Sequence, residues 1–546
     1  MSHIDPLPLL TRMKTNWRSG LTVSLVSIPL SVSLAVASQA SPIVGIITAI
    51  WAGLMASLIG GSHYNIVGPT GALSGIIAMY VIMHGANTLP VLAMLSGMFI
   101  FVAYLLKLER YLVFIPGSAI HGFTLGVAFI IALNQWNFVF GLSGLTKHET
   151  FIDNLWESFT HMYQFSPLTV LVFALSLGFL YAMRKFTTKV PGAIILAPIG
   201  ILLGYMTTMG IVPFSLQTLD TLYPNMHIGL FMPYSLSIFP AMIVPALTIA
   251  LVAIIETMLS AKIADGMTGT KYRRRPEMRG LAVANIVSGL FGGMPATAAL
   301  ARTSLNVKTG ANDKVSATIS SIFIALISLL FLGYFKFIPL AVIGAILVFV
   351  AIQMVEAEHF KRMFLHDRKN FYVSLIVAFI TVYEDPIVGI LFGVGIASIL
   401  LIEKLSRGQF DLVVNDRHKQ VVGHMSGDKL DTIVKGSDTI VYSIAGLLCY
   451  VNGEAHVERF HTALNGYENV ILRLRGVYYI DIDGVETIDE IIRTLKARGK
   501  HVYMTSVNKN ICALLKESEM YRELKQHGHV FEKSADALRH LGFDIA

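Results

Sequence analysis

The sequence predicts an α-helical membrane protein with many spans, followed by a small α/β domain. Of its 546 residues, 54% are hydrophobic and 14% are charged, which excludes an ordinary soluble protein and a disordered one. Apolar runs suited to a bilayer follow one another as far as residue 403. Charged residues become frequent only after that point, where β-branched runs and helical patterns alternate.

Fourteen apolar segments are predicted to span the membrane after a polar N-terminal segment, 1–19. A full span needs about 20 apolar residues; the third and tenth segments are short and begin with Pro after a Gly-containing turn. The transport region, 20–403, thus contains predicted spans at 20–38, 43–59, 68–84, 89–106, 115–135, 166–183, 190–208, 240–261, 279–291, 295–308, 313–333, 337–354, 370–382 and 386–402.

The basic residues of the loops predict the orientation of these spans. If the N-terminus is cytoplasmic, the outside loops hold little Lys or Arg beyond Lys147 and Lys336. Both ends of the chain are then cytoplasmic. The net charge of +7 reflects this loop bias rather than binding to nucleic acid.

The third and tenth segments begin alike, which indicates a duplicated unit of seven spans. Each opens with Pro, at Pro69 and Pro295, followed by small residues and Leu. Because seven is odd, two half-helices would face each other, N-terminus to N-terminus, near the membrane midplane. Their free N–H groups and positive dipole ends favour an anion. The alternative is that these turns simply kink two structural helices.

Arg302 is the strongest candidate for a binding residue. We expect a helix to start near Pro295, with Arg302 about two turns inside it. A charge within a span costs about 2.5 kcal/mol or more and marks a functional site by default. Thr70, Gly71 and Ala72 form the opposing start, where small side chains let an anion reach backbone N–H groups. Alternatively, Arg302 snorkels to the cytoplasmic face.

Glu256 is the second candidate, because it is the one charge in the span Ala241–Ala261. A buried carboxylate pairs with a cation, binds a metal ion or carries a proton. Ser260, one turn later on the same face, adds an oxygen to a possible Na⁺ or H⁺ site. The alternative is a fixed Glu256–Arg302 ion pair that holds two helices together.

No enzymatic or metal constellation emerges from the sequence. Walker A and nucleophile-elbow patterns are absent, and no cofactor is expected beyond a coupling H⁺ or Na⁺. Cys449 and Cys512 are too few for a disulfide scaffold or a zinc site. His456 and His461 flank Glu458 without metalloprotease spacing, so we expect a solvated helix face there.

The C-terminal part is predicted to be a linker, 404–437, followed by an α/β domain, 438–546. Strands and helices alternate over about 110 residues. Strands are expected at 439–445, 470–474 and 501–506, a helix at 485–498, and a closing helix that ends at Leu541 with Ser534 as its N-cap.

A set of short motifs runs in order through the predicted spans. They are Ser41-Pro42 with Gly45, Val67-Gly68-Pro69, Ile255 to Leu259, Asp265 to Thr270, Asn285 to Gly293, and Pro295 to Arg302. In this order and spacing the chain resembles the sulfate permease (SulP) family, bacterial relatives of the animal solute-carrier anion transporters that include prestin. The C-terminal part resembles that family's sulfate transporter and anti-sigma factor antagonist (STAS) domain.

The resemblance implies two inverted seven-helix repeats in a homodimer with an elevator-like movement. Spans one to four and eight to eleven would form a core domain, and the other spans a gate. Substrate would bind between the starts of spans three and ten. Carried over by position, the residues that line this site are Thr70, Gly71, Ala298, Ala299 and Arg302, and Glu256 stands where the family carries a coupling carboxylate.

The resulting hypothesis is a secondary anion transporter of a bacterial inner membrane, coupled to H⁺ or Na⁺ through Glu256. Candidate substrates are sulfate, bicarbonate, chloride and C4-dicarboxylates; Arg302 favours sulfate or dicarboxylates, because Arg engages a carboxylate bidentately. A nucleobase carrier of the same architecture is the first alternative. The second is a membrane-anchored sensor or scaffold in which the α/β domain binds an unidentified cytoplasmic protein and no transport occurs.

Overall fold

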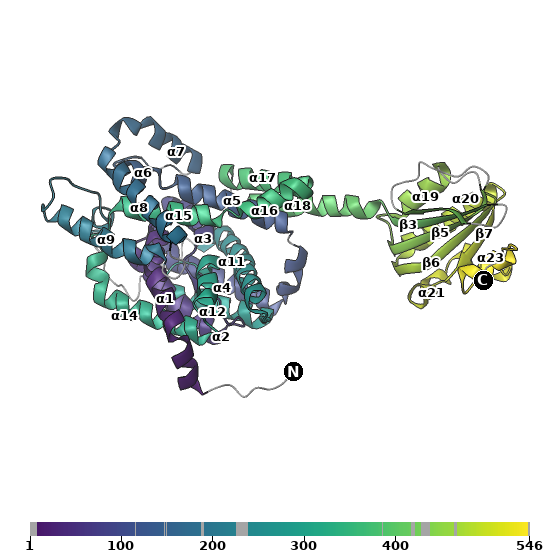
Figure 1. The fold of residues 1–546 in the computed structure, drawn as a ribbon, viewed down its shortest axis with the longest axis horizontal. Coiled ribbons are helices and arrows are strands. Elements are labelled where there is room, and N and C mark those ends of the chain that lie inside the picture. The colour runs from purple at the N-terminus through teal and green to yellow at the C-terminus, as the bar shows by residue number, and fades with distance from the viewer. Residues whose placement is uncertain are drawn as a thin grey trace. The chain divides into compact units, whose positions relative to one another are not determined.

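The computed structural model describes residues 8–114, 116–146, 148, 150–186, 191–224, 239–384, 386–416, 421–426, 437–462 and 467–543. The chain divides into two compact units, residues 1–397 and 398–546. The first unit is almost wholly helical, and the second contains a sheet with helices on both faces (Figure 1). This confirms the predicted combination of a polytopic helical part and a C-terminal α/β domain.

Each predicted span coincides with a helix. In chain order these are α1 (Leu9–Ala37), α2 (Pro42–Ile59), α3 (Gly71–His84), α4 (Leu89–Leu105), α5 (Gly117–Leu133), α8 (Pro167–Phe186), α9 (Gly192–Thr208), α11 (Phe239–Thr268), α12 (Arg274–Leu290), α13 (Leu300–Lys308), α14 (Val315–Phe335), α15 (Leu340–Met354), α17 (Arg368–Tyr383) and α18 (Pro386–Ser406). Within the described residues, nine stretches are long and apolar enough to cross a membrane. The count of fourteen spans stays a prediction.

Several short helices lie between these long ones. They are η1 (Ala86–Thr88), η2 (Leu108–Phe114), α6 (Trp136–Phe140), α7 (Phe151–Thr160), η3 (Met162–Gln164), α10 (Leu219–Leu222) and α16 (Ala357–His366). α16 follows directly on α15 after a break at Val355 and Glu356.

The N-terminal segment predicted as separate, 1–19, is largely part of the first helix, because α1 begins at Leu9. No Pro interrupts the chain between Pro8 and Pro29, so nothing stops the helix at residue 20. Its polar side chains find partners in the second half of the chain: Asn16 Nδ2 donates to Asn312 Oδ1 over 2.8 Å, and Arg12 pairs with Asp313.

Two short strands pair in the middle of the first unit and form what we call the β1–β2 crossing. Their presence corrects one prediction. β1 (Val67–Gly68) pairs antiparallel with β2 (Thr297–Ala298), so Val67 faces Ala298 and Gly68 faces Thr297. The tenth span therefore does not begin as a helix near Pro295. The backbone there forms a strand and makes its hydrogen bonds with β1 and α12, and α13 begins only at Leu300. Arg302 lies in the first turn of α13 rather than two turns inside it.

Close helix packing surrounds this crossing. α12 lies against α2 and α4, and α1 lies against α14 and α2. Gly45 of α2 faces α1 so closely that an added Cβ would collide with the carbonyl oxygen of Ser31. The first unit thus brings its N-terminal helices directly against α11 to α14, as a duplicated, interleaved structure requires.

The second unit is built on a six-stranded sheet with the order β4-β3-β5-β6-β7-β8. Its strands are β3 (Gln409–Asp416), β4 (Val421–Ser426), β5 (Ser437–Leu448), β6 (Asn469–Ile480), β7 (His501–Thr505) and β8 (Val530–Phe531). β3 pairs antiparallel with β4 and β5, whereas β5 to β8 run parallel. The helices are α19 (Gly453–Thr462), α20 (Ile482–Ala497), α21 (Lys509–Leu515), α22 (Glu519–Gln526) and α23 (Ser534–His540).

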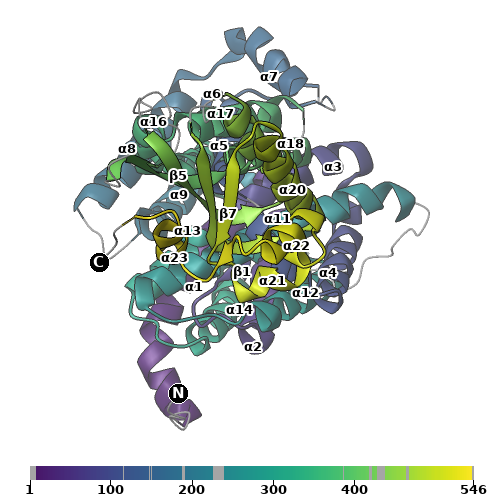
Figure 2. The same cartoon turned by 90° about the vertical axis from the view of Figure 1, so that its right-hand side faces the viewer.

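Side chains alternate in direction along the parallel strands, so apolar residues pack against helices on both faces of this sheet. Ile440 and Tyr442 of β5 join the core formed with α19 to α22, while Val441 between them packs on the α23 side. Figure 2 shows α20 and α22 on one side of the strands and α23 on the other. The expected strands and the expected central helix are all present.

Three predictions for this unit are wrong. The linker predicted at 404–437 contains β3 and β4, whose described residues pair with β5 and with each other. Ser534 is the first residue of α23, and Lys533 is its N-cap; the Ser534 hydroxyl pairs with that of Thr505 over 2.9 Å and does not cap the helix. His456 does not lie on a solvated face: it is fully buried and hydrogen-bonded to the Tyr442 hydroxyl over 2.7 Å.

Candidate functional site

The starts of α3 and α13 meet at the β1–β2 crossing. Thr70 precedes α3 and Ala299 precedes α13, and neither helix start is capped by a side chain. The first-turn N–H groups of both helices are therefore without a side-chain acceptor from their N-cap residues. Ala72 and Ala298 are buried beside these starts, where small side chains leave the backbone accessible to a small ion.

Arg302 is buried at this crossing, with only 2% of its surface exposed. Its Nη2 donates to the carbonyl oxygen of Pro69, while its Nη1 has no hydrogen-bond partner among the described residues. The guanidinium thus bridges from α13 to the residue that precedes the opposite helix start. Because it is buried and points into the crossing, the alternative in which it snorkels to the membrane surface does not apply.

Glu256 and Ser260 of α11 lie beside the start of α3. Thr70 Oγ1 donates to Glu256 Oε2 over 3.1 Å. Ser260 is buried, and its hydroxyl has no partner among the described residues. Glu256 and Arg302 do not approach within 4.0 Å in the described structure, so the fixed ion pair between them is not formed. A carboxylate and an unpartnered hydroxyl remain available near the basic side chain.

Two threonines hold α11 against the crossing. Thr257 Oγ1 lies 2.8 Å from Thr297 Oγ1 and accepts from the Ala298 N–H over 3.1 Å. Thr297 also donates to the Ala253 carbonyl over 3.0 Å. The residue next to Glu256 is therefore fixed to β2, which places the Glu256 carboxylate at the helix starts.

Glu277 anchors the loop that leads into β1, and the sequence analysis did not single it out. The buried carboxylate accepts from the N–H groups of Gly61 and Ser62, both over 2.7 Å, and from Asn65 Nδ2 over 2.7 Å. It lies two residues after the basic run Lys271–Arg275, a position typical of an exposed loop. The signal that could have found it is an acidic residue in the first turn of a helix.

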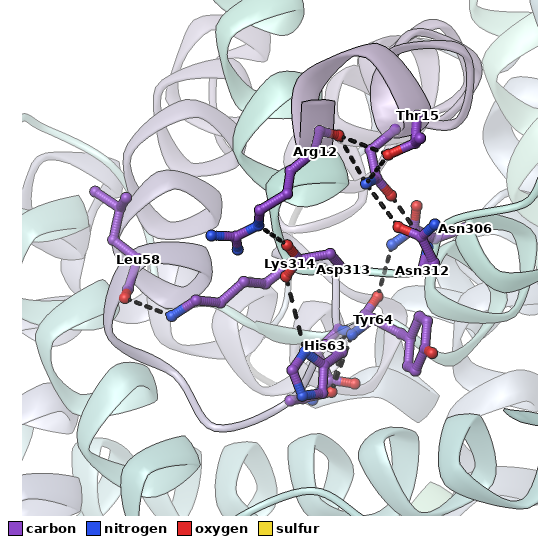
Figure 3. Close-up of polar contacts among 12 residues, drawn as sticks. Arg12, Thr15, Leu58, His63, Tyr64, Asn306, Asn312, Asp313 and Lys314 are labelled. Atoms are coloured by element: carbon purple, nitrogen blue, oxygen red, sulfur yellow. Dashed lines mark hydrogen bonds and ion pairs between the residues drawn. The ribbon is translucent and has the colours of Figure 1, made fainter. Parts of the chain in front are cut away.

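A second anchor fixes the far end of α13. Asn306 Nδ2 donates to the Tyr64 carbonyl over 3.0 Å, and its Oδ1 accepts from Ser19 Oγ over 2.7 Å. Figure 3 shows the neighbouring cluster, in which Arg12 and His63 both point toward Asp313. Together these contacts join α1, the loop before β1 and the α13–α14 connection, so the helix that carries Arg302 is held at both ends.

Gly71 lies on the side of the site that faces α5 and α15. An added Cβ there would meet Ile131 Cδ1 and, at 3.3 Å, Met354 Sδ. One turn further along α3, Gly75 borders a cavity of about 480 Å³, lined also by Ile130 of α5 and by Asn134, which directly follows that helix. The predicted site residues therefore gather at one place, with the Gly71 side facing helices of the predicted gate.

The sequence and structure were compared with known proteins. Residues 13–377 match the profile of the sulfate permease family, and residues 431–537 match that of the STAS domain. The "Putative sulfate transporter YvdB" of Bacillus subtilis (strain 168) is 29% identical over 523 residues, which cover 93% of this chain and 94% of that protein. The "Bicarbonate transporter BicA" of Synechocystis sp. is 22% identical, over 95% of this chain and 93% of that protein.

Solved structures share the fold. A structure of the animal solute carrier SLC26A9 superposes with a TM-score of 0.82 at 14% identity, covering 98% of this chain and 90% of that one. The transmembrane domain of a cyanobacterial bicarbonate transporter BicA gives a TM-score of 0.61 at 20% identity, covering 71% of this chain and 99% of that one. These matches agree with the helical unit and the C-terminal sheet described above. The chain belongs to the sulfate permease family, whose matching relatives are anion transporters and not enzymes, and it carries a STAS domain at its C-terminal end.

Proposed function

We propose that this protein is a secondary active transporter that binds a small anion between the starts of α3 and α13. The observation that carries the proposal is Arg302, which is buried and presents an unpartnered Nη1 beside two uncapped helix starts. A buried cation without a counter-charge in contact is costly in a membrane, so a bound anion would supply the missing interaction. Thr70, Gly71 and Ala72 contribute backbone and small side chains around it, and Ala298 and Ala299 contribute small side chains.

Glu256 and Ser260 would bind the coupling ion. A carboxylate and a buried hydroxyl are oxygen ligands suited to Na⁺, and the carboxylate alone suits H⁺. Thr70 touches Glu256 and also precedes the helix start that faces the anion, so it joins the two parts of the site. With Glu256 protonated or Na⁺-bound, the site has a net positive charge, which suits a divalent anion.

The substrate is proposed to be sulfate or a C4-dicarboxylate, with bicarbonate and chloride as further candidates. The names of the relatives support sulfate and bicarbonate as classes. A guanidinium with a free Nη1 supports an oxyanion that accepts two directed hydrogen bonds. A neutral nucleobase would leave the cation uncompensated, so this alternative is disfavoured.

The working unit is proposed to be a homodimer in a bacterial inner membrane, with both termini cytoplasmic. α3 and α13 would move with α1, α2, α4, α11, α12 and α14 as a core that slides against the remaining helices. The STAS domain would bind a cytoplasmic protein.

A flux screen in proteoliposomes tests the proposed function. Purified protein is reconstituted, and uptake of labelled sulfate, succinate, bicarbonate and chloride is followed under imposed pH and Na⁺ gradients. We expect concentrative uptake of at least one anion, compared with protein-free liposomes. Uptake of none, under any gradient, would favour a membrane sensor or scaffold.

A further inference from the structure

Three metal-ligating side chains meet away from the anion site. They are His121 of α5, Glu356 at the break between α15 and α16, and His359 of α16. One ligand atom from each lies within 4.8 Å of the others. Of the described residues, these form the one group of three or more His, Cys, Asp or Glu side chains with that spacing. None of them has a part in the proposed anion or coupling site.

The geometry within this group is close to that of a bound ion. His121 Nδ1 lies 3.2 Å from Glu356 Oε2, which is about the separation of two ligand atoms on one small cation. The rings of His121 and His359 stack with centroids 3.8 Å apart. Small rotations of two imidazoles would therefore turn three nearby atoms toward one centre without a movement of the backbone.

Local structure explains why the three side chains converge. Glu356 immediately precedes α16, and His359 follows three residues later, so the two side chains lie on one face of the first turn. A Glu-x-x-His pair at this spacing is a recurrent arrangement of metal ligands on helices. His121 lies near the start of α5 and supplies the third ligand from a segment distant in sequence.

The donor set identifies the class of ion. Two imidazole nitrogens and one carboxylate oxygen suit Zn²⁺ and the neighbouring first-row divalent ions, and not Ca²⁺ or Mg²⁺, which prefer oxygen ligands. The side chains of His121 and Glu356 are 19% and 36% exposed, so an ion can enter and a fourth position can be filled by water. We propose that His121, Glu356 and His359 bind one Zn²⁺-class ion, which ties the start of α5 to the start of α16.

Another His–Glu–His arrangement provides a matched control. Glu157 lies between His148 and His161, but its separations from them are 3.8 and 3.6 Å. This trio does not meet the 4.8 Å criterion for all ligand atoms. It contains the same two residue types, two His and one Glu, and is also partly exposed, so it reports non-specific binding by surface His–Glu pairs.

The test is metal binding to the full chain, purified in detergent without a polyhistidine tag. Zn²⁺ affinity is measured by calorimetry, and Co²⁺ is added as a spectroscopic probe, because low-coordinate Co²⁺ absorbs visibly. We expect one Zn²⁺ per chain that is lost in His121→Ala and in His359→Ala. Each should bind at least about 100-fold more weakly, since even changes outside the ligand shell cost 10–100-fold.

The variants separate metal binding from a structural role. Glu356→Gln should weaken Zn²⁺ binding and shift the Co²⁺ spectrum, whereas His161→Ala should leave both unchanged. Thermal unfolding without metal checks that each variant is folded. Equal Zn²⁺ affinity and stoichiometry in wild type, His121→Ala and His359→Ala, all folded, would overturn the proposal and assign any bound metal to another place.

Discussion

The guanidinium of Arg302 depends on a glycine on the opposite strand. An added Cβ at Gly68 would lie 2.9 Å from Nη1 and 3.4 Å from Nη2, so a larger residue there would force the guanidinium to shift. Val67-Gly68-Pro69 thus has a specific physical role: Gly68 makes space, and the Pro69 carbonyl accepts from Nη2. The residue types at the site could be predicted from sequence because a single charge in an apolar span is conspicuous, whereas this steric fit could not.

Glu256 is expected to couple anion movement to an ion gradient. Glu256→Gln keeps the shape of the side chain and an acceptor for Thr70 Oγ1, but it removes the charge that H⁺ or Na⁺ would neutralise. Anion uptake by this variant should therefore persist as exchange and become insensitive to imposed pH or Na⁺ gradients. The measurement is initial uptake in proteoliposomes with and without each gradient. The exposed Glu358, changed to Gln, serves as the control, and gradient-driven uptake by Glu256→Gln would assign coupling to another group.

At the level of elements, the sequence analysis located the helices but not the crossing between them. Long apolar runs predict helices reliably, and each predicted span contains a helix. β1 and β2 contain two residues each, which is too short for any periodicity to indicate a strand. Pro295 looked like a helix start because Pro fits the first turn, but pairing with β1 keeps the chain extended as far as Ala299.

The Glu277 anchor is expected to stabilise the loop before β1. Glu277→Gln replaces a buried carboxylate that accepts three hydrogen bonds by a neutral amide that satisfies them less well. Hydrogen bonds to a charged group contribute about 1.5–3 kcal/mol, so the unfolding free energy should fall by about that amount. In a chain whose three other tryptophans are replaced by Phe, Trp51, which stacks on Phe291 at 3.8 Å, reports unfolding of this region by fluorescence.

Glu358→Gln again supplies the comparison for this measurement, since Glu358 is exposed. If Glu277→Gln unfolded at the same temperature as the wild type, the carboxylate would not stabilise the loop.

His456 is expected to make the STAS domain less stable in acid. Burial, and then the charge of Arg459, lower the pKa of His456 to about 3. Its unfolded pKa is about 6.5, so the unfolded chain binds a proton that the folded chain excludes between these values. Above pH 6.5 this group does not lower the unfolding free energy of the domain. As the pH drops from 6.5 toward 3, the unfolding free energy falls by about 1.4 kcal/mol per pH unit.

Hydrogen exchange of residues 437–462, corrected for the intrinsic rate, measures this pH dependence. His456→Gln should flatten it between pH 6.5 and 4, whereas the exposed His527→Gln should not. An identical pH dependence in wild type and His456→Gln would show that the buried imidazole is not the group responsible.

On the scale of the whole molecule, composition alone divides the chain into its two parts. The composition changes near residue 403, and the second compact unit begins at Ser398, inside α18. β3 and β4 are not predicted from the sequence, because strands at the antiparallel edge of this sheet are polar and weakly patterned. The inverted repeat, which the sequence indicates through the two breaks at Pro69 and Pro295, stays a prediction.

Movement of the proposed core against the proposed gate is expected to be necessary for transport. A Cβ on Gly75 of α3 would lie 3.2 Å from Ile130 Cγ2 of α5, so cysteines at these positions can be joined. With Cys449 and Cys512 replaced by Ala, oxidation of Gly75→Cys/Ile130→Cys should abolish uptake, and a reducing agent should restore it.

The matched control is a pair within the proposed gate. Gly344 and Phe138 approach similarly, at 3.3 Å from the added Cβ to the Phe138 Cβ. Cross-linking Gly344→Cys to Phe138→Cys should leave most uptake intact. Full activity of the oxidised Gly75–Ile130 pair would be incompatible with a sliding core.

The most direct measurement of the central claim is uptake of labelled sulfate and succinate by Arg302→Ala in proteoliposomes. The control is Arg279→Ala, which removes an exposed arginine from α12. If Arg302 binds the anion, loss of a charge-assisted hydrogen bond worth about 1.5–3 kcal/mol should lower the apparent affinity at least tenfold. Arg279→Ala should transport like the wild type. Equal uptake by folded Arg302→Ala and wild type would contradict an anion site between the starts of α3 and α13.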